Sequence, residues 1–262
     1  MPHAVARLRQ QRLARATKPY VARGGHAERC ARCRLPTPQC ACAFTQLGAA
    51  RSGVCLLMGD IEAIKPSNTG WLIADVVPDT FAFEWSRTAV DPALLRLLAD
   101  PQWAPVLVFP AEFAPPERVV HQWPMVSPQA PSSEPAGSEL GGARPLFLLL
   151  DGTWSEARKM FRKSPYLDAL PVLSLNPERS SQYRLRRSKR GDHFCTAEVA
   201  AMCLELAGEG TAAQHLWAYF DVFSDHYLAA KSKCKLDLGD EAHQRLSALT
   251  SSQAPSAKSS SA

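Results

Sequence analysis

Short apolar runs separated by polar turns recur along the chain and predict a buried parallel sheet. These runs occupy residues 53–58, 81–85, 105–109, 145–150 and 172–175. Apolar runs without polar alternation are typical of strands that are buried on both faces. Segments with helical character lie at residues 67–77, 93–99, 151–160, 196–206 and 212–229. Strands that alternate with helices predict an α/β fold, a mostly parallel sheet with helices on both faces.

The two ends of the chain and one internal stretch depart from this pattern. Residues 8–18 are basic and helix-prone, and we expect an arm rather than part of the core. Pro, Ser, Gly and Ala dominate residues 127–144, which predicts a flexible surface insert. The tail beyond about residue 242 is expected to behave in the same way. The 262 residues otherwise suit one catalytic domain with small appendages.

The sequence also bears on the compartment of the protein. No apolar stretch approaches the ~20 residues that a membrane-spanning helix needs. The basic residues of the N-terminus are followed by no apolar signal segment. We therefore expect a cytoplasmic protein with no membrane partner, and no obligate protein partner is evident.

Four of the eight cysteines form one cluster with the spacing C-x2-C-x6-C-x-C, namely Cys30, Cys33, Cys40 and Cys42. Without a secretion signal, a disulfide framework is not expected. Four thiolates suit tetrahedral Zn²⁺, and the metal would fold a loop that is too short for its own core. We expect a structural zinc at this knuckle, without a catalytic role. A redox pair and a metal-free loop are the alternatives.

Positive charge is gathered in three clusters, although the net charge is only +5. The first 34 residues hold nine Lys and Arg residues against one acid, Glu28. The second cluster is Arg158, Lys159, Arg162 and Lys163, and the third is Arg184, Arg186, Arg187, Lys189 and Arg190. A single basic run is usually a solvated face, but three runs around one candidate site favour a nucleic-acid partner.

Polar side chains follow two of the predicted strands, where the carboxyl ends of parallel strands form a ligand crevice. Ser67, Asn68, Thr69 and Gly70 follow the first strand, and Asp151, Gly152, Thr153 and Trp154 follow the fourth. Helix capping by the first group and chain reversal at Asp151 are the structural alternatives. Trp154 is equally a candidate for the core.

Several common enzyme signatures are missing from the sequence. No G-x-G-x-x-G follows a strand, and neither a P-loop nor a G-x-S-x-G elbow occurs. Hydride transfer, ATP hydrolysis and ester hydrolysis therefore lose support.

One block of residues resembles the signature of a known family. Leu149-Leu-Asp-Gly-Thr-Trp154, followed by Glu156-Ala-Arg158, is similar to the signature of the DTW-domain family, the tRNA-uridine aminocarboxypropyltransferases. Further similar blocks are Lys65-Pro-Ser-Asn-Thr-Gly70, Tyr183-Arg184, Cys195-Thr-Ala-Glu-Val-Ala200 and the cysteine knuckle. The resemblance extends from Arg29 to about Lys231. Its blocks are together far more specific than any one of them.

The resemblance implies a SPOUT-like, knotted α/β domain at residues 50–232, after a basic arm at 1–29 and a zinc knuckle at 30–43, with a tail at 233–262. It implies transfer of the 3-amino-3-carboxypropyl group of S-adenosylmethionine to N3 of a uridine in tRNA, with release of 5′-methylthioadenosine. Bacterial members, which the chain resembles most, act on position 47 of the variable loop.

The resemblance also suggests roles for the loop residues. Asp151 is the expected general base or uracil-orienting group, with Glu62 and Glu198 in reserve. The cofactor residues are expected to be Ser67, Asn68, Thr69, Gly70, Thr153, Trp154 and Thr196. The tRNA-binding residues are expected to be Arg158, Lys159, Arg162, Lys163, Arg184, Arg186 and Arg187.

Two departures and three rival functions accompany this interpretation. Many relatives carry His-Pro-x-Glu where this chain has Gly59-Asp-Ile-Glu62, and Trp71 stands where relatives often have Arg. The rivals are a SPOUT-type RNA methyltransferase, aminocarboxypropyl transfer to ribosomal RNA, and an RNA-binding protein without catalysis.

Overall fold

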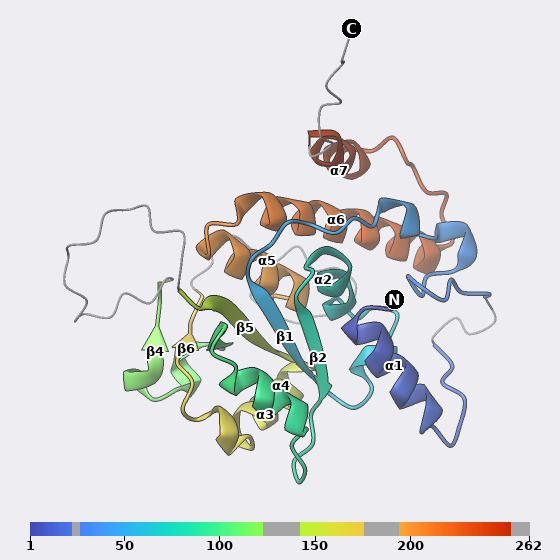
Figure 1. The fold of residues 1–262 in the computed structure, drawn as a ribbon. Helices are drawn as coiled ribbons and strands as arrows, with labels where there is room; N and C mark the ends of the chain where they lie inside the picture. Colours follow the sequence, from blue (N-terminus) through green and yellow to red (C-terminus); the bar gives the residue numbers. More distant parts are fainter. Residues whose placement is uncertain (23–26, 123–141, 176–193, 253–262) are drawn as a thin grey trace, which may run out of the picture.

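A computed structural model describes residues 1–22, 27–122, 142–175 and 194–252 (Figure 1). Most of the predicted insert at 127–144 and the third basic cluster lie outside these residues. The described residues contain a six-stranded, all-parallel sheet in the order β2-β1-β5-β3-β6-β4. The strands are β1 (Gly53–Met58), β2 (Thr80–Glu84), β3 (Trp103–Val108), β4 (Val119–Val120), β5 (Arg144–Asp151) and β6 (Val172–Leu173).

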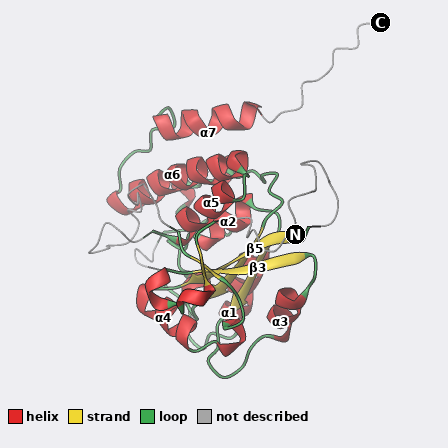
Figure 2. Cartoon of the chain, turned by 90° about the vertical axis from the view of Figure 1, so that its left-hand side faces the viewer, coloured by secondary structure: helices red, strands yellow, loops and turns green. Residues whose placement is uncertain are grey.

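Helices cover both faces of this sheet, as the sequence predicted (Figure 2). They are α1 (Ala4–Ala14), α2 (Gly70–Val76), α3 (Pro92–Ala99), α4 (Trp154–Arg162), α5 (Thr196–Leu206), α6 (Gly210–Ser232) and α7 (Glu241–Ser252). Short 3₁₀ turns occupy Thr37–Gln39, Cys42–Phe44, Glu62–Ile64, Ala111–Phe113, Pro116–Arg118 and Pro165–Leu167. Among the described residues, no helix combines the length and apolarity that crossing a bilayer requires.

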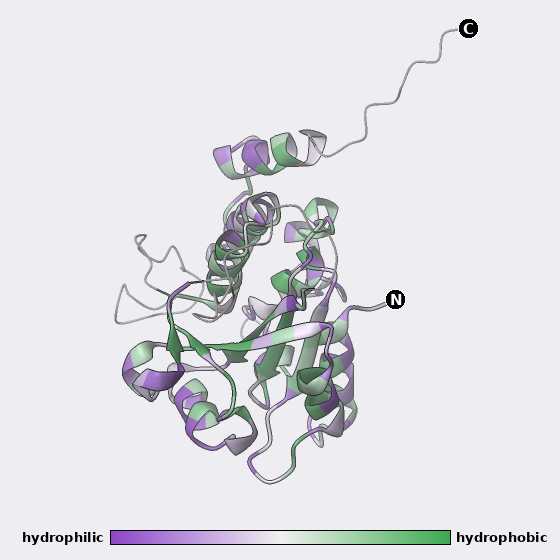
Figure 3. Cartoon of the chain, turned by 60° about the vertical axis from the view of Figure 1, so that its left-hand side comes forward, coloured by the Kyte–Doolittle hydropathy of each residue, from purple (hydrophilic) through white to green (hydrophobic). Residues whose placement is uncertain are grey.

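Alternate residues of the buried strands build two separate cores. In β1, Val54, Leu56 and Met58 pack with α2, α5 and α6 on one face. Cys55 and Leu57 point to the other face, which α3 and α4 cover. Successive side chains of a strand point to opposite faces, so a continuous apolar run is what a sheet covered on both faces requires. Apolar residues accordingly dominate the strands (Figure 3).

The basic segment at the N-terminus is part of the core, so the expectation of a separate arm is wrong. Helix α1 begins at Ala4, four residues earlier than expected, and it packs against the edge strand β2. Ala4, Val5 and Leu8 are buried. These residues form an apolar stripe that a helix starting at Leu8 does not reveal.

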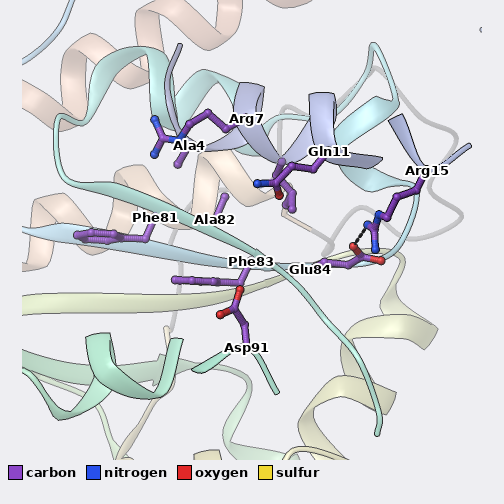
Figure 4. Close-up of a pocket in the computed structure, with 10 residues that line it drawn as sticks. Ala4, Arg7, Gln11, Arg15, Phe81, Ala82, Phe83, Glu84 and Asp91 are labelled. Atoms are coloured by element: carbon purple, nitrogen blue, oxygen red, sulfur yellow. Dashed lines mark hydrogen bonds and ion pairs between the residues drawn. The ribbon is translucent and has the colours of Figure 1, made fainter. Parts of the chain in front are cut away.

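Side chains of α1 also tie it to the polar ends of the strands. Arg12 forms a bidentate ion pair with Asp60, with its Nε 2.6 Å from Oδ1, and Arg15 pairs with Glu84. Between α1 and β2 lies a cavity of about 540 Å³, lined by Leu8 and Phe83 among others and crossed at one end by the Arg15–Glu84 pair (Figure 4). Two of the nine N-terminal cations are thus neutralised within the chain.

The expectation of a flexible tail beyond residue 242 is wrong for the residues of α7. Asp240 accepts the backbone N–H of His243 at the start of this helix, at 3.0 Å, and Leu246 is buried. The His243 Nε2 atom lies 3.0 Å from Nε2 of His226 on α6, whose Nδ1 lies 3.0 Å from the Gln39 carbonyl oxygen. Ser- and Ala-rich composition concealed this small packed face.

The first residue before α1 gives a prediction about stability in acid. The His3 Nδ1 atom accepts the N–H of Ala6 at 3.2 Å, and the ring meets Trp71 edge-on at 4.4 Å. Burial, with a smaller contribution from the positive charge of Arg34, lowers the pKa of His3 from 6.5 to about 4. The folded chain therefore binds fewer protons than the unfolded chain. This contribution to stability is complete above pH 6.5 and is lost as the pH falls towards 4.

We expect His3→Asn to remove this acid sensitivity, because asparagine keeps a capping oxygen without the titrating ring. Between pH 7 and pH 4 the free energy of unfolding should fall by about 2 kcal/mol more in the wild type than in the variant, after allowance for partial exposure of the ring. Urea unfolding of both proteins at the two pH values measures this difference. An equal loss in both proteins would contradict the assignment.

Candidate active site and metal centre

The carboxylate of Asp151 joins three segments that are far apart in the sequence. Asp151 is the last residue of β5 and is 4% exposed. Its Oδ2 accepts a hydrogen bond from the Asn68 amide at 2.7 Å, and its Oδ1 accepts one from the Thr196 hydroxyl at 2.7 Å. The segments after β1, after β5 and at the start of α5 thus meet at one side chain.

The loop before α2 is shaped to approach this carboxylate closely. Besides donating to Asp151, the Asn68 side chain accepts the backbone N–H of Trp71 through Oδ1 at 3.1 Å. The Asn68 amide is therefore fixed at both of its ends. A Cβ atom on Gly70 would lie 2.7 Å from Asp151 Oδ2 and 3.1 Å from Leu56 Cδ1. Glycine is required here because of this contact.

The start of α5 closes the opposite side of the site. Glu198 is buried, and its Oε2 accepts the backbone N–H of Cys195 at 2.7 Å in a capping interaction. The N–H of Ala197 reaches the Thr69 hydroxyl at 3.4 Å. The structure therefore brings Thr69 and Thr196 to the same place, and it gives the Glu198 carboxylate a helix-capping contact.

The third acidic candidate, Glu62, lies in the turn that follows β1. Glu62 is fully buried and forms an ion pair with Lys65. This turn is joined to the end of β5, because the N–H of Gly59 donates to the Asp151 carbonyl at 2.8 Å. Glu62 therefore belongs to a turn that contacts the end of β5, and Lys65 already balances its charge.

Beyond Asp151 the chain turns into α4, whose first residues are more open. Thr153 is exposed and caps α4 through reciprocal hydrogen bonds with Glu156. Trp154 is 40% exposed and stacks on Phe109 with ring centroids 5.5 Å apart. Phe113 meets the same indole edge-on at 5.5 Å. Trp154 is therefore neither a fully buried core residue nor a loose surface side chain.

The exposed side of α4 carries the second basic cluster. Arg158, Lys159, Arg162 and the following Lys163 are all exposed. The Arg158 guanidinium lies 4.8 Å over the Phe113 ring, which holds it beside the aromatic cluster. The other predicted RNA-binding residues, Arg184, Arg186 and Arg187, fall outside the described residues.

The four clustered cysteines have a geometry that fits a tetrahedral metal ion. Their sulfur atoms all lie within 4.8 Å of one another, with 3.5 Å from Cys30 to Cys42 and 3.7 Å from Cys33 to Cys40. A Zn–S bond of about 2.3 Å places the sulfurs of a tetrahedron roughly 3.8 Å apart. All four thiols are free of disulfides. The residues can therefore hold a metal, as their spacing predicted.

Backbone groups already support a thiolate in this cluster. Burial raises the pKa of Cys30, but the N–H groups of Cys33 and Arg32 point at its sulfur and bring the pKa down to about 7. Metal ions bind the thiolate rather than the thiol, so Cys30 is the ligand that this environment prepares near neutral pH. Burial raises the pKa of Cys33 and Cys42, so these two thiols need the metal itself to lose their protons.

Sequence reasoning missed Arg34 as an individual residue and counted it only among the N-terminal cations. Arg34 is buried, and its guanidinium donates to the carbonyl oxygens of Lys65 at 2.9 Å and Asn68 at 3.4 Å. It also lies 4.0 Å over the ring of Trp71. Burial lowers the pKa of Arg34 to about 10, so the side chain stays charged at neutral pH. Its position between two apolar residues of the knuckle was the available signal.

These features define an α/β protein with a polar site at the carboxyl edge of a parallel sheet, beside a four-cysteine centre. The family model of the DTW domain matches residues 27–228. The chain therefore belongs to the DTW domain family, which is known as a family of tRNA aminocarboxypropyltransferases. This confirms the resemblance noted in the sequence. No solved structure matches the chain.

The close approach at Gly70 gives a prediction for the site. Gly70→Ala should lower the free energy of unfolding by about 1–3 kcal/mol, because the added methyl group must displace the Asp151 carboxylate or Leu56. Gly210→Ala is the matched control, since a Cβ there meets nothing within 4 Å. That change should be neutral or slightly stabilising. Chemical unfolding of the two variants compares them directly, and equal stability of both would overturn this account of Gly70.

Proposed function

We propose that this protein transfers the 3-amino-3-carboxypropyl group of S-adenosylmethionine to N3 of a uridine in tRNA, with position 47 as the expected target. One observation carries the proposal. The residues of the DTW signature coincide with the place where Asp151, Asn68 and Thr196 meet at the edge of the sheet. In parallel α/β sheets, ligands bind at this edge.

The reaction needs positioning and removal of one proton. N3 of the uridine forms a bond with the γ-carbon of the methionyl chain while the bond from that carbon to sulfur breaks. The electron pair of the broken bond stays on sulfur, which leaves as the neutral thioether 5′-methylthioadenosine. The N3 proton passes to a base. Because the sulfonium is already a good leaving group, alignment of the two substrates is the main task for the protein.

Asp151 is the residue that we propose to handle the uracil edge or its proton. The hydrogen bonds from Asn68 and Thr196 hold the carboxylate in one orientation at the carboxyl edge of the sheet. Glu62 and Glu198 are the alternative candidates for the general base. Each already has a structural role, because Glu62 pairs with Lys65 and Glu198 caps α5.

The donor substrate is proposed to lie against the loop that precedes α2 and the start of α5. Ser67, Thr69 and Gly70 belong to that loop. Thr196 lies opposite the loop, because its hydroxyl donates to Asp151 and the N–H of the next residue reaches the Thr69 hydroxyl. Thr153 and Trp154 would border the same site from the beginning of α4. With the methionyl chain held here, the γ-carbon rather than the methyl group would face the uridine.

The tRNA is proposed to cross the exposed face of α4. The four cations there can neutralise phosphates, and Trp154, which is 40% exposed, can contribute to base stacking. A uridine of folded tRNA must leave its stack before N3 is accessible. The cysteine centre would hold a structural zinc, which would supply stability to the knuckle and no step of the reaction.

The product distinguishes this function from its rivals. Purified protein, S-adenosylmethionine and unmodified tRNA should give aminocarboxypropyl-uridine and 5′-methylthioadenosine, detected by mass spectrometry of nucleosides and small molecules. A methylated nucleoside with S-adenosylhomocysteine would identify a methyltransferase instead. Modification of ribosomal RNA but not tRNA would move the activity to another substrate. No product from either RNA would refute catalysis.

The role of Asp151 can be tested by one isosteric change. Asp151→Asn should reduce the transfer rate about 100-fold or more, because the amide cannot take up a proton. Asp168→Asn is the matched control, since Asp168 is exposed and pairs only loosely with Arg118 at 3.7 Å. Single-turnover rates with saturating tRNA measure both. An undiminished rate in folded Asp151→Asn protein would exclude Asp151 as the base.

A further inference from the structure

The cysteine knuckle and the loop before α2 are joined by one buried side chain. Arg34 directly follows the metal-ligand candidate Cys33, and its guanidinium reaches across to the carbonyls of Lys65 and Asn68. The amide of that same Asn68 donates to Asp151. A continuous set of contacts therefore leads from the four sulfurs to the proposed catalytic carboxylate.

Arginine is well suited to this position, and lysine is not. The planar guanidinium donates in two directions while its face rests on Trp71 at 4.0 Å. A lysine ammonium is a compact point charge, so it cannot both donate to these two carbonyls and stack on Trp71. Loss of the guanidinium would leave the carbonyl oxygens of Lys65 and the buried Asn68 without these donors.

The conformation of Arg34 depends on closure of the knuckle. Its backbone φ is +68°, in the left-handed region that is unfavourable for an arginine. Two hydrogen bonds hold this turn, from the Arg34 N–H to the Cys30 carbonyl at 2.9 Å and from the Cys30 N–H to the Leu35 carbonyl at 2.8 Å. A metal bound by Cys30 and Cys33 would close the same turn. Without it, the strained backbone has less to restrain it.

We propose that Arg34 is a positioning residue for the loop at Lys65–Gly70, and that metal bound at the knuckle thereby sets the affinity for S-adenosylmethionine. This inference rests on the proposed function for the identity of the ligand. The knuckle is then a support of the active site, in addition to any contact that it makes with RNA.

A purely structural role for the guanidinium is the main alternative. Arg34 also lies near the buried Asp75, which accepts a hydrogen bond from the Tyr219 hydroxyl at 3.0 Å. Tyr219→Phe disturbs this same buried group of side chains but leaves the Lys65 and Asn68 carbonyls untouched. It is therefore the matched control, because it should lower the unfolding temperature without changing cofactor affinity.

The affinity experiment uses four states of the full chain. Arg34→Lys should keep one zinc per chain by elemental analysis and bind S-adenosylmethionine about tenfold or more weakly by calorimetry, because small displacements of a binding loop have large effects. Removal of the metal from the wild type by a chelator should weaken binding by a similar factor. Removal of the metal from Arg34→Lys should weaken binding little further, because the substitution and the metal removal act through the same contacts.

Any of three results would overturn the proposal. The first is an Arg34→Lys affinity within twofold of the wild type. The second is that the factors by which Arg34→Lys and metal removal weaken binding multiply when they are combined, because independent sites behave additively in free energy. The third is an equal weakening in Tyr219→Phe, which would assign the effect to general destabilisation.

Hydrogen exchange gives a test that needs no cofactor and no substitution. The Trp71 amide, which donates to Asn68 Oδ1, should lose about tenfold or more in protection when metal is removed from the native chain, while the Leu56 amide in β1 keeps its protection. Unchanged protection at Trp71 would refute the connection even if Arg34→Lys failed to fold. A wild type that does not bind S-adenosylmethionine would instead refute the proposed function, and the exchange result would still decide whether the knuckle supports the loop before α2.

Discussion

The hydrogen bonds to the Asp151 carboxylate are the constraint on which the site depends. Residues Gly53–Met58 of β1 pair in parallel with Leu146–Asp151 of β5. Met58 and Asp151 therefore lie side by side at the carboxyl edge of the sheet. A carboxylate at this position is nearly buried, and such a charge is stable only with donors directed at it. Asn68 and Thr196 supply those donors from segments that are 128 residues apart. The loop, the strand end and α5 must therefore form together.

Much of the fold follows from simple patterns, and the failures have physical causes. The apolar runs located β1, β2, β3, β5 and β6, and β1 is the clearest case, because a strand buried on both faces needs no polar alternation. Strand β4 is as short as β6, but its two valines are flanked by Arg118 and His121, so no apolar run marks it. Helix α7 was missed because Leu246 and His243 are a small packed minority among Ser and Ala. The knot that the resemblance implies stays a prediction.

The site was predictable in composition but not in its internal connections. Position after a strand identified Asp151, Asn68 and Thr69 as candidates, and the DTW signature strengthened them. Nothing in the local sequence says that Asn68 points at Asp151, or that Arg34 leaves the surface and lies on Trp71. Those contacts depend on long-range packing. The count of N-terminal cations overstates the unpaired positive charge there for a related reason, since Arg12 and Arg15 are paired with acids far along the chain.

The two histidines between α6 and α7 have a consequence for how distant parts of the chain are held together. His243 Nδ1 lies 2.7 Å from Asp240 Oδ1, and the two Nε2 atoms lie 3.0 Å apart. At the other end, His226 Nδ1 lies 3.0 Å from the carbonyl oxygen of Gln39. The C-terminal helix is thus connected through two imidazole rings to the residue that precedes Cys40, so the end of the described chain braces the cysteine centre near its beginning.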